Sequence, residues 1–428
     1  MASLTGLAQL VSVPGLLAGK HVDQAVGAVT DVILREHVQG HGDIRAQAIK
    51  ALTAMAHSVP QSVRDRSVPA FMVDLPDVTE GETVPSTVLE AFAQLATERQ
   101  IFDTVVLRLK NKLRAARHQG ASTGYQRALV FAMLYAFTFG NPMQEDGLIR
   151  SAYYADYAEP LIADFVKDAS SQPDSVMVDA IGRIANIILR AQGVHYQSGV
   201  YHRGLEWLAR GDDSTDAAGS QRPDVSPFLL YYYAALRPEV VEATDIIGRL
   251  QQQSNAAVSE SDGKASTSAT SLRLISLLVN KFANPKTMKA TLVETGLEVD
   301  ALVHDTASPQ ALCVAFAVVK GLLIQGKSGA LTTRYLQTLL DLLPTSTDTS
   351  ARQFATLLAP DDILTKANHC LISGLYKQKV FNQCIPFLTT TLRTADPAQK
   401  PRYLVALSGL LRWLPYSVLE PSLADLTP

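Results

Sequence analysis

Cysteine is scarce in this chain. It has three cysteines in 428 residues, Cys313, Cys370 and Cys384, and no two of them form a C-x-x-C pair. A disulfide framework or a structural zinc site needs more thiols at closer spacing. We therefore expect small, buried, reduced thiols. Contact of Cys370 and Cys384 with a metal cluster in transit is the less favoured alternative.

An excess of positive charge is also missing. Lys and Arg number 38 against 41 Asp and Glu, a formal net charge of −3. General nucleic-acid binders carry a strong basic excess, so we expect no direct contact with nucleic acid. The charged fraction of 18% lies below the usual value of about 25% and suits helices packed on both sides.

Long apolar runs are absent as well. The longest lies near residues 128–139 and is shorter than the roughly 18 residues that a membrane span needs. No secretory signal is evident, because the first basic residue is Lys20 and a signal peptide carries positive charge before its apolar stretch. The sequence predicts no membrane association and a protein of the cytoplasm and nucleus.

Catalytic signatures are missing too. The chain has no phosphate-binding glycine loop, dinucleotide fingerprint, nucleophile elbow or H-E-x-x-H. His195 and His202 stand seven residues apart, but no Cys or carboxylate lies at ligand spacing and Gly193 and Gly199 are expected to interrupt their helix. The sequence therefore predicts no enzyme, no metal site and no cofactor.

What the chain does contain is helical periodicity from end to end. In the stretch 179–193, five aliphatic residues recur at i, i+3, i+4, i+7 and i+8, one stripe of a 3.6-residue helix: Ile181, Ile184, Ala185, Ile188 and Leu189. Alternating strand patterns are nearly absent. The pattern predicts about twenty helices, including one over 361–375.

Apolar–proline pairs punctuate these helices at intervals. They are Val13-Pro14, Val59-Pro60, Leu343-Pro344, Ile385-Pro386 and Leu414-Pro415. The first two pairs are 46 residues apart and the next two 42, within the period of about 40–47 of HEAT and armadillo repeats. Because proline is tolerated in a first helical turn, each pair is expected to close one helix and open the next.

These features predict an all-α fold, a continuous α-solenoid of about ten HEAT-type repeats over residues 1–428. Two stretches, 211–223 and 254–268, are rich in small and polar residues and are expected to be disordered loops. The acidic stretch 74–85 is expected to be a solvated connector, or else a contact for a basic partner.

Two clusters of like residues leave alternatives open. The basic cluster is a solvated helix face or a patch for an acidic partner, and its members are Arg108, Lys110, Lys112, Arg114 and Arg117. In the tyrosine clusters, the rings of consecutive residues cannot all lie on one side of a helix. We expect one or two rings of each in the core and the others in the neighbouring groove or on the surface; packing between repeats is favoured, and a protein interface is the alternative. The clusters are Tyr153, Tyr154 and Tyr157, and Tyr231, Tyr232 and Tyr233.

The last third of the chain contains more distinctive sequence motifs. It includes Leu277-Leu278-Val279-Asn280-Lys281, Val319-Lys320-Gly321-Leu322, Asp361-Asp362-Ile363-Leu364 and Lys400-Pro401-Arg402-Tyr403-Leu404. In this order and spacing, residues 270–421 resemble the MMS-nineteen family, the HEAT-repeat scaffold of the cytosolic iron–sulfur protein assembly (CIA) targeting complex. These are packing motifs and mark no site.

The resemblance implies a non-enzymatic adaptor. Such scaffolds join a small cluster-transfer subunit and a WD-repeat propeller subunit, and they engage iron–sulfur client proteins of DNA replication and repair, such as helicases and polymerases. The alternative is a generic HEAT-repeat interaction scaffold, of the transport-receptor or phosphatase-scaffold type.

Family members continue beyond the position that matches Leu423, so the resemblance also implies a fragment that lacks the last repeats. This leaves docking of the partner subunits on this chain open. Lys400, Arg402, Trp413 and Tyr416 lie near the end and are the candidate partner-binding residues. For Trp413, packing against a further repeat is the favoured interpretation.

Overall fold

The computed structural model describes residues 2–35, 42–74, 86–140, 152–167, 174–212, 226–242, 269–304 apart from 283 and 285, 308–344 and 348–422. All regular elements in these ranges are helices. The chain divides into two compact units, Met1–Ala191 and Gln192–Pro428. The predicted all-α solenoid class is confirmed, while the count of about ten repeats and the unbroken course over 1–428 stay predictions.

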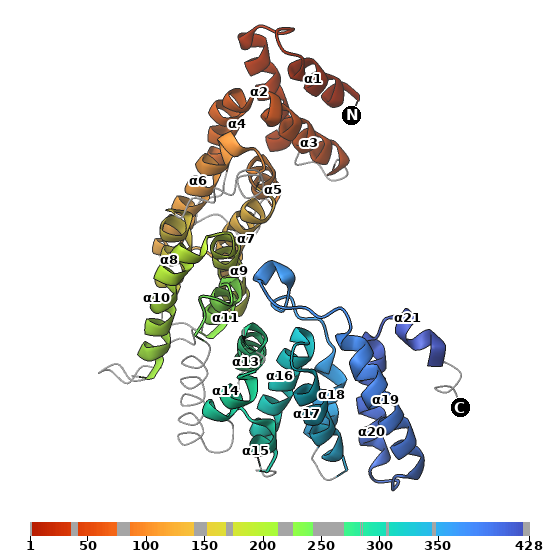
Figure 1. The fold of residues 1–428 in the computed structure, drawn as a ribbon. Coiled ribbons are helices and arrows are strands. Elements are labelled where there is room, and N and C mark those ends of the chain that lie inside the picture. The colour runs from red at the N-terminus through yellow and green to blue at the C-terminus, as the bar shows by residue number, and fades with distance from the viewer. Residues whose placement is uncertain are drawn as a thin grey trace. The chain divides into compact units, whose positions relative to one another are not determined.

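Unit 1 consists of helices stacked in two layers (Figure 1). One layer contains α1 (Ala2–Ser12), α3 (Gly42–Ser58), α5 (Ser86–Leu95), α7 (Thr123–Phe139) and α9 (Ser175–Arg190). The other contains α2 (Gly19–Arg35), α4 (Pro60–Asp74), α6 (Arg99–His118), the π-helix η2 (Tyr154–Ala158) and α8 (Glu159–Lys167). Each helix contacts the next one in its layer from α1 to α9 and from α2 to α6, the arrangement expected of a solenoid.

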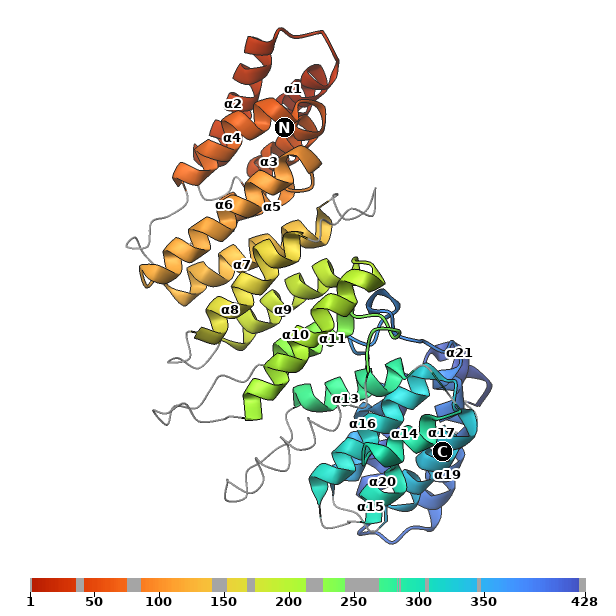
Figure 2. The ribbon, with the colours of Figure 1, turned by 60° about the vertical axis from the view of Figure 1, so that its left-hand side comes forward.

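Unit 2 repeats the two-layer pattern, and Figure 2 shows its helices from a second side. The first layer runs through α11 (Ser226–Ala235), α13 (Ala269–Lys281), α16 (Pro309–Gln325), α18 (Asp348–Leu357) and α20 (Lys400–Trp413). The second includes α15 (Val299–His304), α17 (Gly329–Asp341) and α19 (Tyr376–Thr394). The remaining elements are α10 (Val194–Asp212), α14 (Met288–Glu294), η3 (Lys366–Asn368), α21 (Tyr416–Leu419) and η4 (Glu420–Ser422).

Burial follows the predicted stripes. In α9, the five aliphatic side chains of the 179–193 pattern are all 1% exposed or less, so the periodicity did locate the core face. In α3, Ala48, Ile49 and Leu52 are buried at the same helical spacing. Burial of such faces between neighbouring helices is the main source of stability in a stack of this kind.

Pairs of proline and apolar residues mark helix ends at four of five positions. Pro60 opens α4, Pro14 lies between α1 and α2, Pro344 follows α17 and Pro415 separates α20 from α21. The fifth expectation is wrong, because Pro386 lies inside α19. A proline within a helix removes one backbone hydrogen bond, and α19 accommodates that loss without ending.

The helix expected over 361–375 is also wrong. Residues 359–375, which we call the strap, are ordered but non-helical apart from the single turn η3. The Asn280 side chain of α13 exchanges two hydrogen bonds of 2.9 Å with the backbone of Leu371. The Ser373 N–H donates to the Ile324 carbonyl of α16 at 2.7 Å. These bonds satisfy the backbone groups that a helix would have paired internally.

One end of the strap is fixed by charge. The Asp361 side chain is 7% exposed, and its carboxylate accepts hydrogen bonds from the Arg273 guanidinium of α13 at 2.7 and 3.1 Å. Although burial alone would raise the pKa of Asp361, Arg273 and the Ile363 N–H hold it below its usual value. Lys320 of α16 donates to the Ala359 carbonyl at 3.1 Å. The strap therefore joins α13 to α16 through polar contacts.

Of the predicted loops, 254–268 lies outside the described residues. Residues 211 and 212 close α10, and 213–223 again lie outside. The acidic connector is described only at Asp74, the last residue of α4. None of the described helices is both long enough and apolar enough to cross a bilayer.

Candidate partner-binding surfaces

The described residues contain no metal site. No group of three His, Cys, Asp or Glu residues among them is placed to hold a metal ion. Cys370 and Cys384 are buried, and Cys313 is half-buried. Burial raises the pKa of Cys384 to about 12, so its sulfur is a thiol rather than the thiolate that binds metals.

The helix that carries His195 and His202 also departs from expectation. Gly199 was expected to interrupt it, yet α10 runs unbroken from Val194 to Asp212. Gly193 stands just before its first residue. Both imidazoles lie on exposed positions. The spacing of i and i+7 therefore brings them to one side of a single helix, without a third ligand among the described residues.

The four predicted partner-binding residues form two separate pairs. Lys400 and Arg402 lie in the first turn of α20, while Trp413 and Tyr416 lie at and beyond its last residue. At 1.5 Å per residue the ends of this 14-residue helix are about 20 Å apart. The structure does not bring the four into one site.

Contacts within the chain occupy two of these residues. The Arg402 guanidinium donates to the Pro344 carbonyl at 3.2 Å and lies 3.5 Å from the Asp348 carboxylate. The Trp413 carbonyl accepts a 2.8 Å hydrogen bond from Lys377, and the Arg412 guanidinium stacks 5.0 Å from the centre of its ring. Arg402 therefore joins α20 to the segment around α17 and α18, and Trp413 joins it to α19.

Tyr416 remains a candidate, and α20 itself carries exposed apolar residues near its start that the sequence reasoning missed. Tyr416 is 65% exposed, and Leu404 and Val405 of α20 are 51% and 43% exposed. The opposite face of α20 packs through Tyr403, Ala406 and Leu410. The exposed face of α20 is therefore suited to contact with a further helix or with a partner.

A second exposed surface follows α7. Phe131, Tyr135 and Phe139 recur at intervals of four residues and are 45%, 38% and 55% exposed. The Tyr135 and Phe139 rings are in contact, with centroids 4.6 Å apart. We call these three residues the aromatic stripe. The other face of α7 is buried against α5, α6 and α9.

The position of the stripe explains why the sequence reasoning missed it. The stretch 128–139 is apolar almost throughout, which hides the difference between its two faces. The four-residue spacing of its aromatic rings was the available signal, because residues at i, i+4 and i+8 share one side of a helix. Exposed aromatic residues in contiguous groups are typical of protein-binding surfaces.

The tyrosine clusters, by contrast, are core. All six residues are at most 6% exposed, which agrees with the favoured packing interpretation, so only the expectation that some rings would reach the surface is wrong. Tyr153 and Tyr157 surround Phe137 at 6.2 and 5.8 Å between centroids. Tyr232 and Tyr233 pack edge to face at 5.3 Å. In α11 the consecutive rings are buried because α13 packs on the helix and α10 contacts it through Val200 and Tyr201.

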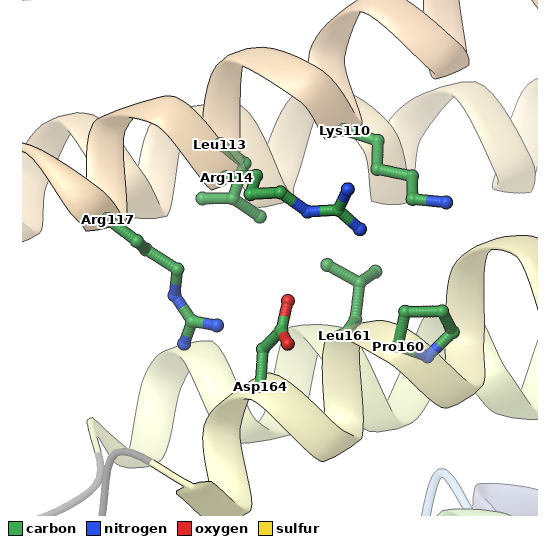
Figure 3. A pocket seen from close by; sticks show the side chains of 7 residues that line it. All are labelled: Lys110, Leu113, Arg114, Arg117, Pro160, Leu161 and Asp164. Carbon is green, nitrogen blue, oxygen red and sulfur yellow. The ribbon is translucent and has the colours of Figure 1, made fainter.

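The basic cluster of α6 divides between two sides of that helix. Arg108 and Lys112 lie on one side of the buried stripe, and Lys110, Arg114 and Arg117 on the other, at i, i+4 and i+7. The second set lines a small surface groove between α6 and α8, together with Leu113, Pro160, Leu161 and Asp164 (Figure 3).

Comparison with known proteins gives one family. Residues 88–428 match the model of the family described as RNAPII transcription regulator C-terminal, MMS19_C. Across its whole length the chain is similar to the MMS19 nucleotide excision repair protein homolog of Xenopus laevis, with 23% identity over 466 residues, and it covers 44% of that protein.

Shorter stretches are more similar to mammalian relatives. A protein of the same name from Mus musculus is 28% identical over 215 residues, which is 49% of this chain and 20% of the relative. The Homo sapiens homolog is 32% identical over 120 residues, or 27% of this chain and 12% of the relative. The chain thus spans less than half the length of the curated relatives it matches.

Proposed function

Because this chain belongs to the MMS19_C family of RNAPII transcription regulator C-terminal regions, we propose that it is a non-enzymatic adaptor. In this role it links the cytosolic iron–sulfur assembly machinery to apo client proteins of DNA replication and repair, including helicases and polymerases. Its relatives are named for nucleotide excision repair, which is in keeping with such clients. The adaptor would work in the cytoplasm and the nucleus.

The observation that carries this proposal is the aromatic stripe on a stacked-helix unit. Tyrosine and phenylalanine supply large contact areas at low conformational cost, and they dominate the energetics of many protein interfaces. Phe131, Tyr135 and Phe139 present such area in a line on α7. We assign the stripe to contact with protein partners, either the targeting-complex subunits or their clients.

The partners proposed are the small cluster-transfer subunit and the WD-repeat propeller subunit of the targeting complex, together with the clients. An adaptor of this kind positions carrier and client and needs no ligands of its own for the cluster. On unit 2, the exposed Leu404 and Val405 of α20 offer a second protein-contact surface, and Tyr416 beyond the end of that helix is a separate exposed candidate.

Co-purification tests the proposal. The tagged 428-residue chain is co-expressed with the two subunits and one client, and the recovered proteins are quantified. We expect recovery of at least one of them with the wild-type chain. Tyr135→Ala combined with Phe139→Ala should reduce that recovery about tenfold or more, since each exposed aromatic residue at a hot spot contributes about 2 kcal/mol.

Leu107→Ala is the matched control. Leu107 is a large apolar residue of α6, 48% exposed, and its truncation should leave recovery unchanged. If the wild-type chain recovers neither subunit nor client, the adaptor proposal fails. Recovery instead of transport cargo or a phosphatase subunit would favour a generic scaffold. Equal losses in the Leu107 and stripe variants would refute the assignment of the stripe.

A further inference from the structure

The groove between α6 and α8 in unit 1 carries an excess of positive charge. Lys110, Arg114 and Arg117 line one wall, and Asp164 of α8 is the single carboxylate of the lining. The lining therefore has a formal charge of +2. Neither Arg114 nor Asp164 has an ion-pair partner within 4.0 Å among the described residues. Figure 3 shows the Asp164 carboxylate pointing toward α6 between Arg114 and Arg117.

Two of the cations are held in place by aromatic rings. Lys110 donates to the Asp156 carbonyl of the π-helix η2, and its ammonium lies 5.1 Å from the centre of the Tyr157 ring. The Arg117 guanidinium stacks 4.2 Å from the Phe165 ring. These cation–π contacts fix the side chains at low entropic cost, so the wall is preorganised.

The positive charges of Lys110 and Arg114 also repel each other. Burial lowers the pKa of Lys110, and the neighbouring charge of Arg114 lowers it further, against the opposing effect of Asp156 and Asp164. A bound anion would relieve this repulsion. The ammonium of Lys110 has three donors, and its bond to Asp156 leaves the others available.

We propose that this groove binds a carboxylate-bearing segment of a partner protein, with Arg114 as its main contact. Arginine binds carboxylates through two parallel hydrogen bonds. Leu113, Pro160 and Leu161 line the floor; the two leucines are buried, and the half-buried Pro160 offers an apolar contact to the aliphatic stem of Glu or Asp. The inference does not depend on the adaptor role.

The spacing of the cations along α6 indicates the conformation of the bound peptide segment. From Lys110 to Arg114 the helix rises about 6 Å, close to the distance of about 6.6 Å between alternate residues of an extended peptide. A segment with acidic residues at i and i+2 therefore matches two cations at once.

Nucleic acid fits less well than a peptide. A phosphate backbone needs an unbroken positive track, whereas the axial span from Lys110 to Arg117 is about 10 Å and Asp164 stands opposite it. Asp156 of η2 acts on Lys110 as a neighbouring negative charge. It would repel a continuous polyanion, while a short peptide with two carboxylates avoids it.

Fluorescence anisotropy with the full 428-residue chain tests the proposal. The probe is a fluorescein-labelled ten-residue peptide with Glu at alternate positions between Ser residues. We expect it to bind, and the peptide with Gln in place of Glu to bind at least tenfold more weakly. Arg114→Gln should weaken binding of the Glu peptide about tenfold, since it removes charge-assisted hydrogen bonds.

Two variants of the chain serve as internal comparisons. Arg108→Gln makes the same change of charge on the other side of α6 and should alter binding less than twofold. Asp164→Asn removes the groove's own carboxylate and should tighten binding several-fold. Thermal melting by circular dichroism checks that every variant keeps the wild-type fold.

Three results would overturn the proposal. The first is binding of the Glu and Gln peptides with equal affinity, or of neither. The second is an equal loss in the Arg108 and Arg114 variants, which would indicate diffuse attraction. The third is tighter binding of a labelled single-stranded oligonucleotide than of the Glu peptide, which would assign the groove to nucleic acid.

Discussion

Replacement of Lys281 by methionine should destabilise unit 2 by an amount that grows with pH. Lys281 is the last residue of α13, and its side chain is buried. Its ammonium donates to the carbonyls of Tyr233 at 2.9 Å and Ala234 at 2.7 Å, and also to that of Leu236. These carbonyls end α11, where a helix leaves its last acceptors without internal partners.

The pH dependence comes from the pKa of this group. Burial lowers the pKa of Lys281 to about 7 from an ordinary 10.5, while the nearby Cys370 opposes that shift. Between these two values the unfolded chain binds the proton and the folded chain does not. Stability contributed by Lys281 therefore rises with pH above about 7. At pH 9, two units above the folded pKa, the rise is about 2.7 kcal/mol.

The loss of stability caused by Lys281→Met should increase with pH in the same way. At pH 6 the variant loses three hydrogen bonds but also avoids burying a charge, and the two effects nearly cancel, leaving about 1 kcal/mol. At pH 9 the wild type gains its neutral, hydrogen-bonded amine, whereas the variant keeps buried carbonyls without donors. The cost should then reach about 3–4 kcal/mol.

Urea unfolding followed by tryptophan fluorescence measures this cost. Both tryptophans, Trp207 and Trp413, fall within unit 2, so the signal reports on the unit that contains Lys281. The difference between wild type and variant removes the titration of other groups. A difference that is the same at pH 6 and pH 9 would show that the carbonyls keep the ammonium charged. That result would refute the reasoning.

Three further substitutions test the packing of unit 2. Arg273→Gln should cost about 2 kcal/mol at pH 7 by leaving the buried Asp361 carboxylate without its main partner. Because the pKa of Asp361 is lowered, this cost should shrink as the pH falls below about 4 in urea titrations. Gly409→Ala would place a Cβ 2.2 Å from that of Ala355, so thermal melting should show a loss of about 1–3 kcal/mol. Gly199→Ala, with nothing within 4 Å of the new Cβ, should instead gain about 0.5–1 kcal/mol.

The sequence predicted the helices well because their signal is local. A stripe of apolar residues at helical spacing needs only a neighbouring helix to bury it, and α9 is buried as its pattern indicates. The helix predicted over the strap was wrong because the signal there is not local. Its apolar residues Ile363, Leu364 and Leu371 also fit a helical spacing, but distant residues, Arg273 and Asn280, pair with its polar groups and keep it non-helical.

The motifs that resemble the family contain residues that join distant elements of the fold, which their apolar pattern did not indicate. Asn280 and Lys281 are polar residues that bond to the strap and to the end of α11. At Gly321, a Cβ would lie 2.5 Å from the Ser276 carbonyl oxygen, so α13 and α16 approach closely there. Such pairings join residues about 40 to 90 positions apart, which a single sequence does not reveal.

The exposure of the predicted partner-binding residues depends on neighbours that the sequence alone does not show. Arg402 and Trp413 have partners within the chain, whereas Tyr416 is exposed. The aromatic stripe stands in an apolar stretch whose two faces differ only once α5 and α9 cover one of them. The basic cluster likewise separates into two sides only when the buried stripe of α6 is known.

Site-specific crosslinking at α7 tests most directly whether the chain binds protein partners through the aromatic stripe. A photoreactive benzophenone side chain replaces Tyr135, and in a parallel sample it replaces Leu107. Each chain is irradiated with the two targeting-complex subunits and a client. We expect a covalent adduct with one of these partners from position 135 and none from position 107. A complex that forms without an adduct at 135, or with equal adducts at both positions, would contradict the proposal.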